Sequence, residues 1–225
     1  MHVGIRGLSL ILCVLLLPAT ARAFRRRLLQ KLSVKQVVKA GGSAITDKQS
    51  FETLKDSALQ HTAASLARSE LATSTVLVHG AGSFGHFQAS EHAVSKGEAH
   101  ERFSWHGFAQ TRSSVTRLNA LVVSALLREG LAACTLHPFP GWRTRSKRTI
   151  VANAMSDVRL LLSRGLLPVM HGDAVFDSSQ GAAVLSGDAL VVALCKALRP
   201  ERVVFLTDVA GVYDRPPGQP VRRVD

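Results

Sequence analysis

The sequence predicts an α/β protein with a largely parallel central sheet. Short apolar runs alternate with longer segments of helical spacing, and the runs are apolar throughout rather than at every second residue. Such runs are typical of parallel strands that helices cover on both faces of the sheet. Four of the five runs also end in glycine or polar residues. Parallel sheets bind ligands at the carboxyl ends of their strands, so this edge is where we expect the site.

Each element has its own signal. The apolar runs predict strands at residues 35–42, 74–80, 131–138, 166–173 and 201–208. The apolar spacing predicts helices at residues 51–71, 105–129, 152–165 and 187–198. Pro138 closes the third strand, and Gly165 ends the third helix. The basic segment "RTRSKR" at residues 143–148 is interpreted as a solvated loop, with contact to an anion as the alternative. No internal repeat or domain-sized linker interrupts residues 35–225, which we expect to form one domain.

The amino-terminal 34 residues are interpreted as a targeting segment. Arg6 precedes the apolar run "LSLILCVLLLP", and "ATARA" supplies an A-x-A cleavage pattern that ends at Ala23. The run is too short for a membrane span, which needs about 20 residues. Such a segment leads into the secretory pathway. The basic stretch after Ala23 leaves two interpretations open, a plain secretory signal and a two-part plastid address of the kind found in algae with complex plastids.

The charge balance excludes few classes of protein, but a modest positive excess is compatible with an anionic small substrate. Of the 28 basic residues, seven lie in the first 35 positions together with no acidic residue. The rest of the chain therefore carries 21 basic and 16 acidic residues. No DNA- or RNA-binding motif accompanies this modest excess, so we expect no nucleic-acid partner.

The cysteines and histidines predict neither a disulfide framework nor a metal centre. Cys13 lies in the leader, and Cys134 and Cys195 sit in apolar runs where we expect them to be buried packing residues. There is no C-x-x-C pair. The nine histidines show no H-E-x-x-H or other metal spacing, so a zinc site is not expected.

Two glycine-rich turns follow neighbouring strands, "GGS" at residues 41–43 and "GAGS" at residues 80–83. Backbone N–H groups surround an anion only where side chains leave room, and a following helix amino terminus adds positive charge. One such turn indicates a nucleotide site. Two turns at one edge predict a site that holds a donor and an acceptor, both of which carry phosphate.

A dinucleotide site is the alternative for the second turn, because residues 80–85 satisfy G-x-G-x-x-G. That fingerprint needs an acidic residue at a strand end about 20 residues later. Glu98 and Glu101 lie near that distance, but the surrounding "KGEAHERFSW" does not resemble a strand end. No Walker-type G-x-x-x-x-G-K-[ST] is present.

Cationic residues beside the turns favour phosphoryl transfer. Lys39 and Lys48 flank the first turn, and lysine supplies the compact positive charge that a moving phosphoryl group needs. His86 closes the second turn and could donate a hydrogen bond to an acceptor phosphate. For each of the three, a surface role without function is the alternative. His79, before the turn, is interpreted as structural.

Three aspartates at the same edge have two interpretations each. Asp188 either caps a helix or orients the lysines and the shell of a Mg²⁺ ion. Asp173 and Asp208 carry the same ambiguity. Mg²⁺ needs few protein carboxylates, since phosphates and waters fill most of its shell.

Five segments occur in an order that resembles the isopentenyl phosphate kinases of the amino acid kinase superfamily: "VVKAGGSAITDK", "VLVHGAGSFGH", "LPVMHGDAVFD", "LSGDAL" and "FLTDVAGVYDRPP". The similarity covers residues 35–217, and "GAGSFGH" is its most specific part. It implies a three-layer α/β/α sandwich. It also implies transfer of the γ-phosphoryl group of ATP, with Mg²⁺, to isopentenyl phosphate, whose prenyl tail would enter an apolar pocket built by the helices after His86.

The resemblance also implies a role for each matching residue. Lys39 and Lys48 would hold the transferring phosphates, and Asp188 would organise the lysines. Gly41, Gly42 and Ser43 would face the ATP phosphates. Gly80, Ala81 and Gly82 would line the transfer region, where Ala81 replaces a glycine of many members but keeps the backbone donor. His86, Gly172 and Asp173 would bind the acceptor phosphate. Thr207, Asp208, Gly211, Val212 and Tyr213 would begin the nucleotide pocket.

Two further expectations follow from the resemblance. Members of the family continue past the segment that ends here at Asp225, with another glycine-rich stretch, a lysine and the last strands. The chain is therefore expected to lack the carboxyl-terminal part of the domain, as an incomplete gene model, a fragment or an inactive relative. A different phosphotransferase of the superfamily and a non-catalytic phosphate binder stay open as functions. Dimers are usual in such families.

Overall fold

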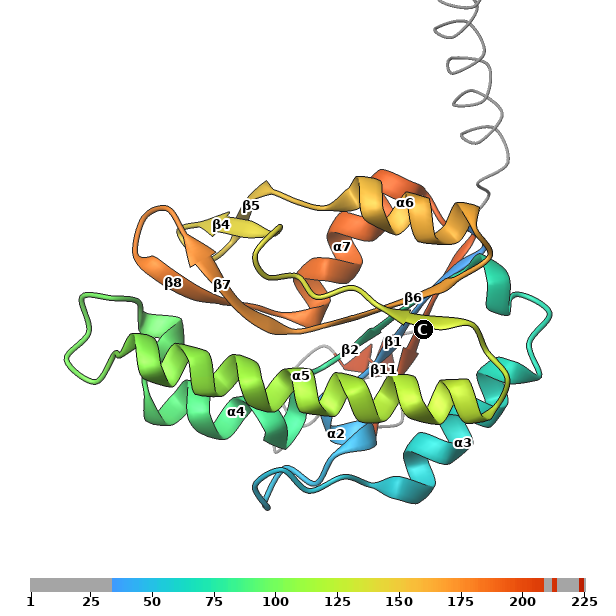
Figure 1. The fold of residues 1–225 in the computed structure, drawn as a ribbon, viewed down its shortest axis with the longest axis horizontal. Helices are drawn as coiled ribbons and strands as arrows, with labels where there is room; N and C mark the ends of the chain where they lie inside the picture. Colours follow the sequence, from blue (N-terminus) through green and yellow to red (C-terminus); the bar gives the residue numbers. More distant parts are fainter. Residues whose placement is uncertain (1–33, 209–211, 214–222, 225) are drawn as a thin grey trace, which may run out of the picture. The chain divides into compact units, whose positions relative to one another are not determined.

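A five-stranded parallel sheet forms the centre of the domain (Figure 1). In the computed structural model of the chain, residues 34–208, 212–213 and 223–224 are described. In order across the sheet, the strands are β3 (Ala133–Thr135), β6 (Leu167–His171), β2 (Thr75–His79), β1 (Gln36–Ala40) and β9 (Arg202–Leu206). Every neighbouring pair is parallel. The five predicted strands and their parallel arrangement are thus confirmed.

Helices cover both faces of this sheet, which confirms the three layers (Figure 1). On one side lie α6 (Met155–Ser163) and α7 (Gly187–Leu198). On the other side lie α3 (Asp56–Ala67), α4 (Gly82–Glu91) and α5 (Trp105–Arg128). The shorter elements are α2 (Gly42–Ile45), η1 (Ala72–Ser74), η2 (Val94–Lys96), β10 (Val212–Tyr213) and β11 (Arg223–Val224).

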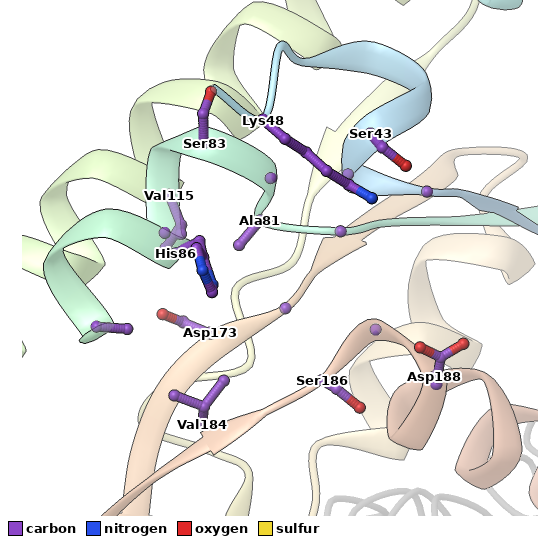
Figure 2. Close-up of a pocket in the computed structure, with 18 of the residues that line it drawn as sticks. Ser43, Lys48, Ala81, Ser83, His86, Val115, Asp173, Val184, Ser186 and Asp188 are labelled. Carbon is purple, nitrogen blue, oxygen red and sulfur yellow. The ribbon is translucent and has the colours of Figure 1, made fainter. Parts of the chain in front are cut away.

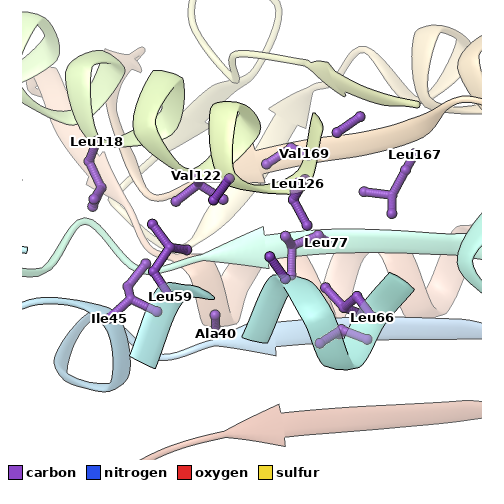
Figure 3. Packing of buried hydrophobic residues seen from close by; sticks show 14 of the residues in the cluster. Ala40, Ile45, Leu59, Leu66, Leu77, Leu118, Val122, Leu126, Leu167 and Val169 are labelled. Atoms are coloured by element: carbon purple, nitrogen blue, oxygen red, sulfur yellow. The ribbon is translucent and has the colours of Figure 1, made fainter. Parts of the chain in front are cut away.

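The main core lies between the sheet and helices α3 and α5 (Figure 3). Leu118, Val122 and Leu126 recur at every fourth position of α5, which places them on one face of the helix. They pack in the same buried cluster as Leu77 of β2 and Val169 of β6. Burial on both faces explains why these strands are apolar throughout, since helices exclude water from each side.

Helix ends follow the predicted signals in part. Ser104 caps α5, because its hydroxyl accepts a hydrogen bond from the backbone N–H of Gly107 at 3.0 Å. Gly165 follows α6 with a φ of 73°, as predicted for the end of that helix. The helix predicted for residues 51–71 is shorter and begins only at Asp56. Residues 46–54 form a closed loop instead, with a β-bridge between Thr46 and Leu54.

A second, four-stranded sheet was not predicted. Its order is β5 (Thr149–Ala152), β4 (Arg143–Arg145), β7 (Asp173–Asp177) and β8 (Gly181–Leu185). The interpretation of residues 143–148 as a loop is therefore wrong for its first half, which is strand β4. Asp177 holds this region together, since its carboxylate accepts hydrogen bonds from the hydroxyl of Thr144 and the backbone N–H of Lys147, both at 2.8 Å.

The cysteine prediction needs a correction as well. Cys134 and Cys195 are free thiols, but both are partly exposed rather than buried. Within the described residues, no helix is both long and apolar enough to cross a bilayer. The targeting segment predicted for residues 1–34, with Cys13, lies outside the described residues apart from Val34.

Candidate active site

The two glycine-rich turns meet at the carboxyl edge of the sheet, as predicted. They follow the neighbouring strands β1 and β2, in which Ala40 is paired with His79. A Cβ atom built on Gly42 would lie only 2.6 Å from the backbone nitrogen of Gly82. Gly82 itself has a φ of 51°, a left-handed conformation that favours glycine. The backbones of the two turns therefore touch, and no side chain fits between them.

We expect Gly42→Ala to separate the turns. The added methyl group overlaps backbone atoms, which cannot rotate away, so the free energy of unfolding should fall by about 1–3 kcal/mol. Urea unfolding of the two proteins measures this difference. Gly187→Ala is the matched control, because the nearest atom to its added Cβ is the backbone oxygen of His79 at an ordinary 3.5 Å. Equal losses in both variants would contradict the close contact of the turns.

A cavity of about 1080 Å³ opens over both turns (Figure 2). The predicted site residues that line it are Lys39, Gly41, Gly42, Ser43, Lys48, Gly80, Ala81, Gly82, His86, Gly172, Asp173, Asp188 and Thr207. They come from the carboxyl ends of β1, β2, β6 and β9, from helices α2, α4 and α7, from the start of β7 and, for Lys48, from the loop after α2. The parallel topology has thus brought together residues that lie far apart in the sequence.

The remaining predicted residues lie elsewhere. Asp208 does not line the cavity, but its carboxylate accepts a hydrogen bond from the hydroxyl of Ser43 at 2.8 Å. This bond is the largest cause that lowers the pKa of Asp208, and the charges of Lys48 and Lys55 add to it. Gly211 lies outside the described residues. Val212 and Tyr213 form β10, which pairs with β11.

Lys39 and Asp188 form an ion pair at the cavity, with 2.6 Å between Nζ and Oδ1. Asp188 belongs to the first turn of α7, but it does not cap that helix. The cap is Ser186, whose hydroxyl accepts a hydrogen bond from the backbone N–H of Ala189 at 3.1 Å. Of the two interpretations of Asp188, the one in which it orients a lysine therefore fits the geometry, and the helix cap is wrong.

Lys55 supports the first glycine-rich turn, and the sequence did not predict this role. Lys55, which precedes α3, donates a hydrogen bond from Nζ to the backbone oxygen of Ser43 at 2.8 Å. Lys48 lines the cavity, and its side chain extends toward Ser43 (Figure 2). The first turn therefore lies in a positively charged environment, which suits a polyphosphate.

His86 and Asp173 face the cavity on the side of the second turn (Figure 2). Arg112 of α5 donates hydrogen bonds to both oxygens of Asp173, at 3.3 and 3.4 Å from its Nε. Burial of the carboxyl raises the pKa of Asp173 to about 6, although the charge of Arg112 and its hydrogen bonds act against this rise. The side chain of Asp173 is thus engaged by Arg112, and its backbone is part of β7, where it is paired with Leu185 of β8.

Arg112 was also missed, yet the sequence carries a signal for it. It falls four residues after Phe108, a buried residue on the same face of α5. Its guanidinium carbon lies 4.1 Å from the ring centroid of Phe139. A cation on the apolar face of a helix is unusual unless a buried anion pairs with it, and here that anion is Asp173.

Buried histidines lie behind both turns. His79 and His171 end β2 and β6, and their ring centroids are 5.6 Å apart. Burial lowers the pKa of both, that of His171 to about 3, so both rings are neutral at physiological pH. Nδ1 of His171 lies 2.9 Å from the oxygen of Gly172, and its Nε2 lies 2.8 Å from Nδ1 of His137.

This network assigns the tautomer of His171. A neutral ring donates from Nδ1 to the oxygen of Gly172 and accepts at Nε2 from His137. Nδ1 of His79 lies 3.0 Å from the oxygen of Gly80 in the same way. Each histidine thus holds the carbonyl group of the glycine that follows it, Gly172 or Gly80. Because the C=O and N–H of a trans peptide lie in one plane and point in opposite directions, this hydrogen bond also orients the N–H of the next residue.

The cavity continues beyond His86 into an apolar region. Its walls include Ala89 of α4, Val115 of α5, Ala174 of β7 and Val184 of β8. The prediction of an apolar pocket built by the helices after His86 is therefore only part of the arrangement, since the unpredicted second sheet supplies the opposite wall.

The dinucleotide interpretation of residues 80–85 does not fit this geometry. Glu98 and Glu101 lie in the turns after η2, not at a strand end, and the indole of Trp105 donates to Glu98 at 3.3 Å. The next strand of the central sheet along the chain is β3, and it ends at Thr135, which is not acidic and lies much more than 20 residues after the turn. The acidic residue that should bind a ribose is thus missing from the required place.

Comparison with known proteins agrees with the class that this fold and site define, a phosphate-binding three-layer α/β enzyme. The sequence model of the Amino acid kinase family matches residues 35–225. Solved aspartate kinases share the fold at 17% and 16% identity, with TM-scores of 0.54. The chain belongs to the amino acid kinase family.

Within this family, the chain groups with the isopentenyl phosphate kinases. It is 40% identical over 222 residues to the isopentenyl phosphate kinase of Arabidopsis thaliana, which covers 82% of this chain and 67% of the relative. It is 39% identical to the one of Methanothermobacter thermautotrophicus, over 80% of this chain and 70% of the relative. An X-ray structure of isopentenyl phosphate kinase superposes with a TM-score of 0.75 at 36% identity, over 84% of this chain and 78% of that one.

Proposed function

We propose that this protein transfers the γ-phosphoryl group of ATP to isopentenyl phosphate, which yields isopentenyl diphosphate and ADP. The observation that carries the proposal is the contact between the turns at Gly42 and Gly82, inside one cavity that also has an apolar end. Two phosphate-binding turns in contact can hold two phosphate groups face to face, and the apolar end suits a short hydrocarbon tail.

The nucleotide would lie on the side of the first turn. The backbone N–H groups of Gly42 and Ser43 would face its phosphates, whereas that of Gly41 donates to the oxygen of Leu206 at 2.8 Å. Gly41 would line this side of the pocket, and Thr207 would begin the nucleotide pocket. Lys39 and Lys48 would contact the transferring phosphoryl group. The ion pair with Asp188 does not prevent Lys39 from contacting this group. The side chain of Asp188 is 67% exposed, and an exposed ion pair is weak.

The acceptor would lie on the side of the second turn. His86 would donate a hydrogen bond to its phosphate, joined by the backbone N–H groups of Ala81 and Gly82. Gly80 and Gly172 would line this side without donating, because their N–H groups are bonded to the oxygens of Ala40 and His79. The prenyl tail would contact the apolar wall that includes Val115 and Val184. In the reaction, an anionic oxygen of this phosphate attacks the γ-phosphorus of ATP in line, the bond to the bridging oxygen breaks, and ADP leaves. No general base is required, because the attacking oxygen carries no proton.

Mg²⁺ fits the residues that are present. Among the described residues there is no group of three or more metal-ligating side chains, so the ion would be bound mainly by phosphates and water. The exposed carboxylate of Asp188 at the cavity would contact its hydration shell. When bound, the ion neutralises charge on the β- and γ-phosphates.

Release of ADP from ATP and Mg²⁺ in the presence of isopentenyl phosphate tests the proposal. A coupled assay on the purified protein should show turnover with isopentenyl phosphate and none with isopentenol, which lacks the acceptor phosphate. Turnover only with another phosphate or phosphonate would indicate a different phosphotransferase of the family. Binding of both ligands without turnover would indicate a non-catalytic phosphate binder.

His86→Ala tests the assignment of the acceptor side. Loss of a hydrogen bond to a charged phosphate should raise the KM for isopentenyl phosphate about 10- to 100-fold, while the KM for ATP stays unchanged. The control is His61→Ala, an exposed histidine on α3 that does not line the cavity. Equal effects on both substrates, or no effect on either, would show that His86 does not bind the acceptor.

A further inference from the structure

The loop that carries Lys48 is closed and firmly anchored. It runs from the end of α2 to the start of α3, and the β-bridge between Thr46 and Leu54 joins its two limbs. The backbone N–H of Asp47 also donates to the oxygen of Thr53 at 2.9 Å. Lys48 lies on the first limb and lines the cavity, so the position of the loop determines the position of this lysine.

Glu52, on the second limb, attaches the loop to α5. One carboxylate oxygen accepts a hydrogen bond from the hydroxyl of Ser114 at 2.6 Å, and the other forms an ion pair with Arg117. Ser114 is buried, and the side chain of Glu52 is only 16% exposed. This contact joins residues that are 62 positions apart in the sequence.

The backbone of Glu52 is in an unfavourable conformation. Its φ is 49°, in the left-handed region that residues with a Cβ atom rarely adopt. Such conformations persist only where the surroundings hold them, and they are common at functional sites. Two partners on α5, Ser114 and Arg117, hold the side chain of this residue.

The same loop is connected to both glycine-rich turns. The hydroxyl of Thr46 donates to the oxygen of Gly42 at 2.8 Å and accepts from the backbone N–H of Ser83 at 3.1 Å. The backbone N–H of Thr53 donates to the hydroxyl of Ser83 at 3.3 Å. The base of the loop is therefore fixed against the turns, and the contact of Glu52 with α5 fixes its outer part.

Helix α5 also forms part of the acceptor side of the cavity. Thr111 and Val115 line the cavity from this helix, and Ser114 lies between them in sequence. One rigid helix thus contacts the region proposed for the acceptor and holds the loop that carries Lys48. We propose that Glu52 is a positioning residue, which couples the placement of Lys48 to α5. This inference rests on the role proposed above for Lys48.

A double-mutant cycle tests the coupling. Glu52→Ala should lower kcat/KM about tenfold, because small displacements of a group that positions a phosphate are costly. In the Lys48→Ala background the same change should have less than about a twofold effect, because the lysine that it positions is gone. If Glu52→Ala costs the same factor in both backgrounds, Glu52 acts independently of Lys48 and the inference is wrong.

Two conservative variants and one control sharpen the test. Glu52→Gln keeps an oxygen for Ser114 but loses the charge, and Arg117→Ala removes only the ion pair, so both should have smaller effects than Glu52→Ala. Glu201→Ala is the matched control. It removes another interelement ion pair, that of Glu201 with Lys35 at the opposite end of the strands, and should leave kcat/KM unchanged.

Amide hydrogen exchange tests the anchoring without any need for turnover. Glu52→Ala should accelerate exchange in residues 47–53, whereas Glu201→Ala should not. Unchanged exchange in Glu52→Ala would overturn the inference, even if the wild-type protein transferred no phosphate. Absence of ADP release from the wild-type protein, by contrast, would count against the proposed function alone.

Discussion

Replacing Lys39 with alanine is expected to lower kcat by about 100-fold or more, with a smaller change in the KM for isopentenyl phosphate. A phosphoryl group in transfer carries charge that preorganised cations stabilise, and loss of one such group typically costs several kcal/mol in the transition state. Lys39 has the required placement, since it lines the cavity next to the first turn and is oriented by Asp188 at 2.6 Å. Steady-state kinetics of the ADP-release reaction measures the effect.

Lys35→Ala is the matched control for this prediction. Lys35 directly precedes β1, the strand that also contains Lys39, and it forms an ion pair with Glu201. It lies at the opposite end of the strand from the cavity. A comparable loss of kcat in both variants would show that lysines on this strand matter for stability and not for transfer.

Acid is expected to destabilise the protein through His171. Its pKa is about 3 in the folded protein and about 6.5 in the unfolded chain, so its stabilising contribution is complete above pH 6.5 and declines as the pH falls toward 3. At pH 5 the loss from this residue amounts to about 2 kcal/mol. The main physical cause is the cost of burying a charged ring, and the nearby charge of Arg112 adds to it.

The measurement is a comparison of His171→Gln with the wild-type protein in urea at pH 8 and at pH 5. Glutamine does not titrate, so the stability gap between the two proteins should narrow by about 2 kcal/mol on acidification. His61→Gln, at an exposed position of α3, should show the same gap at both pH values. A gap that does not depend on pH for His171→Gln would mean that the ring titrates normally.

The titration of Asp173 changes the free energy of unfolding in the opposite direction between about pH 4 and pH 6. Its pKa is raised to about 6, so the folded protein binds a proton more tightly than the unfolded chain does, and stability from this group falls as the pH rises from about 4 to 6. On acidification from pH 8 to pH 5, the gap between wild-type protein and Asp173→Asn should therefore widen by about 1 kcal/mol. The opposite signs of the two changes distinguish the histidine from the carboxyl.

Local patterns were sufficient to predict the central sheet and the turns. The apolar runs at residues 74–80 and 166–173 predict buried parallel strands because a strand that helices cover on both faces has no polar side. Parallel strands have their carboxyl ends at one edge, and because β1 is paired directly with β2, the glycines after these two strands are neighbours. The contact between the backbones of Gly42 and Gly82 was not predicted and comes from the structure.

The second sheet was beyond such reasoning. Strands β4 and β5 are three and four residues long. β4 carries two exposed arginines, and the short run "TIVA" of β5 is exposed or only partly buried. What fixes β4 is the carboxylate of Asp177, which accepts from Thr144 more than thirty positions earlier in the chain. Short strands that depend on one distant polar partner have no periodic signal of their own.

The sequence by itself determined which residue types stand at the strand ends, and so the presence of two glycine-rich turns with nearby lysines and a histidine. Only the tertiary structure decided how these groups are held. Lys39 meets Asp188 across 149 positions of the chain, and Asp173 meets Arg112 across 61. The reason is physical: periodicity and turn chemistry act over a few neighbouring residues, whereas the partner of a buried or oriented charge depends on which helices and strands pack together.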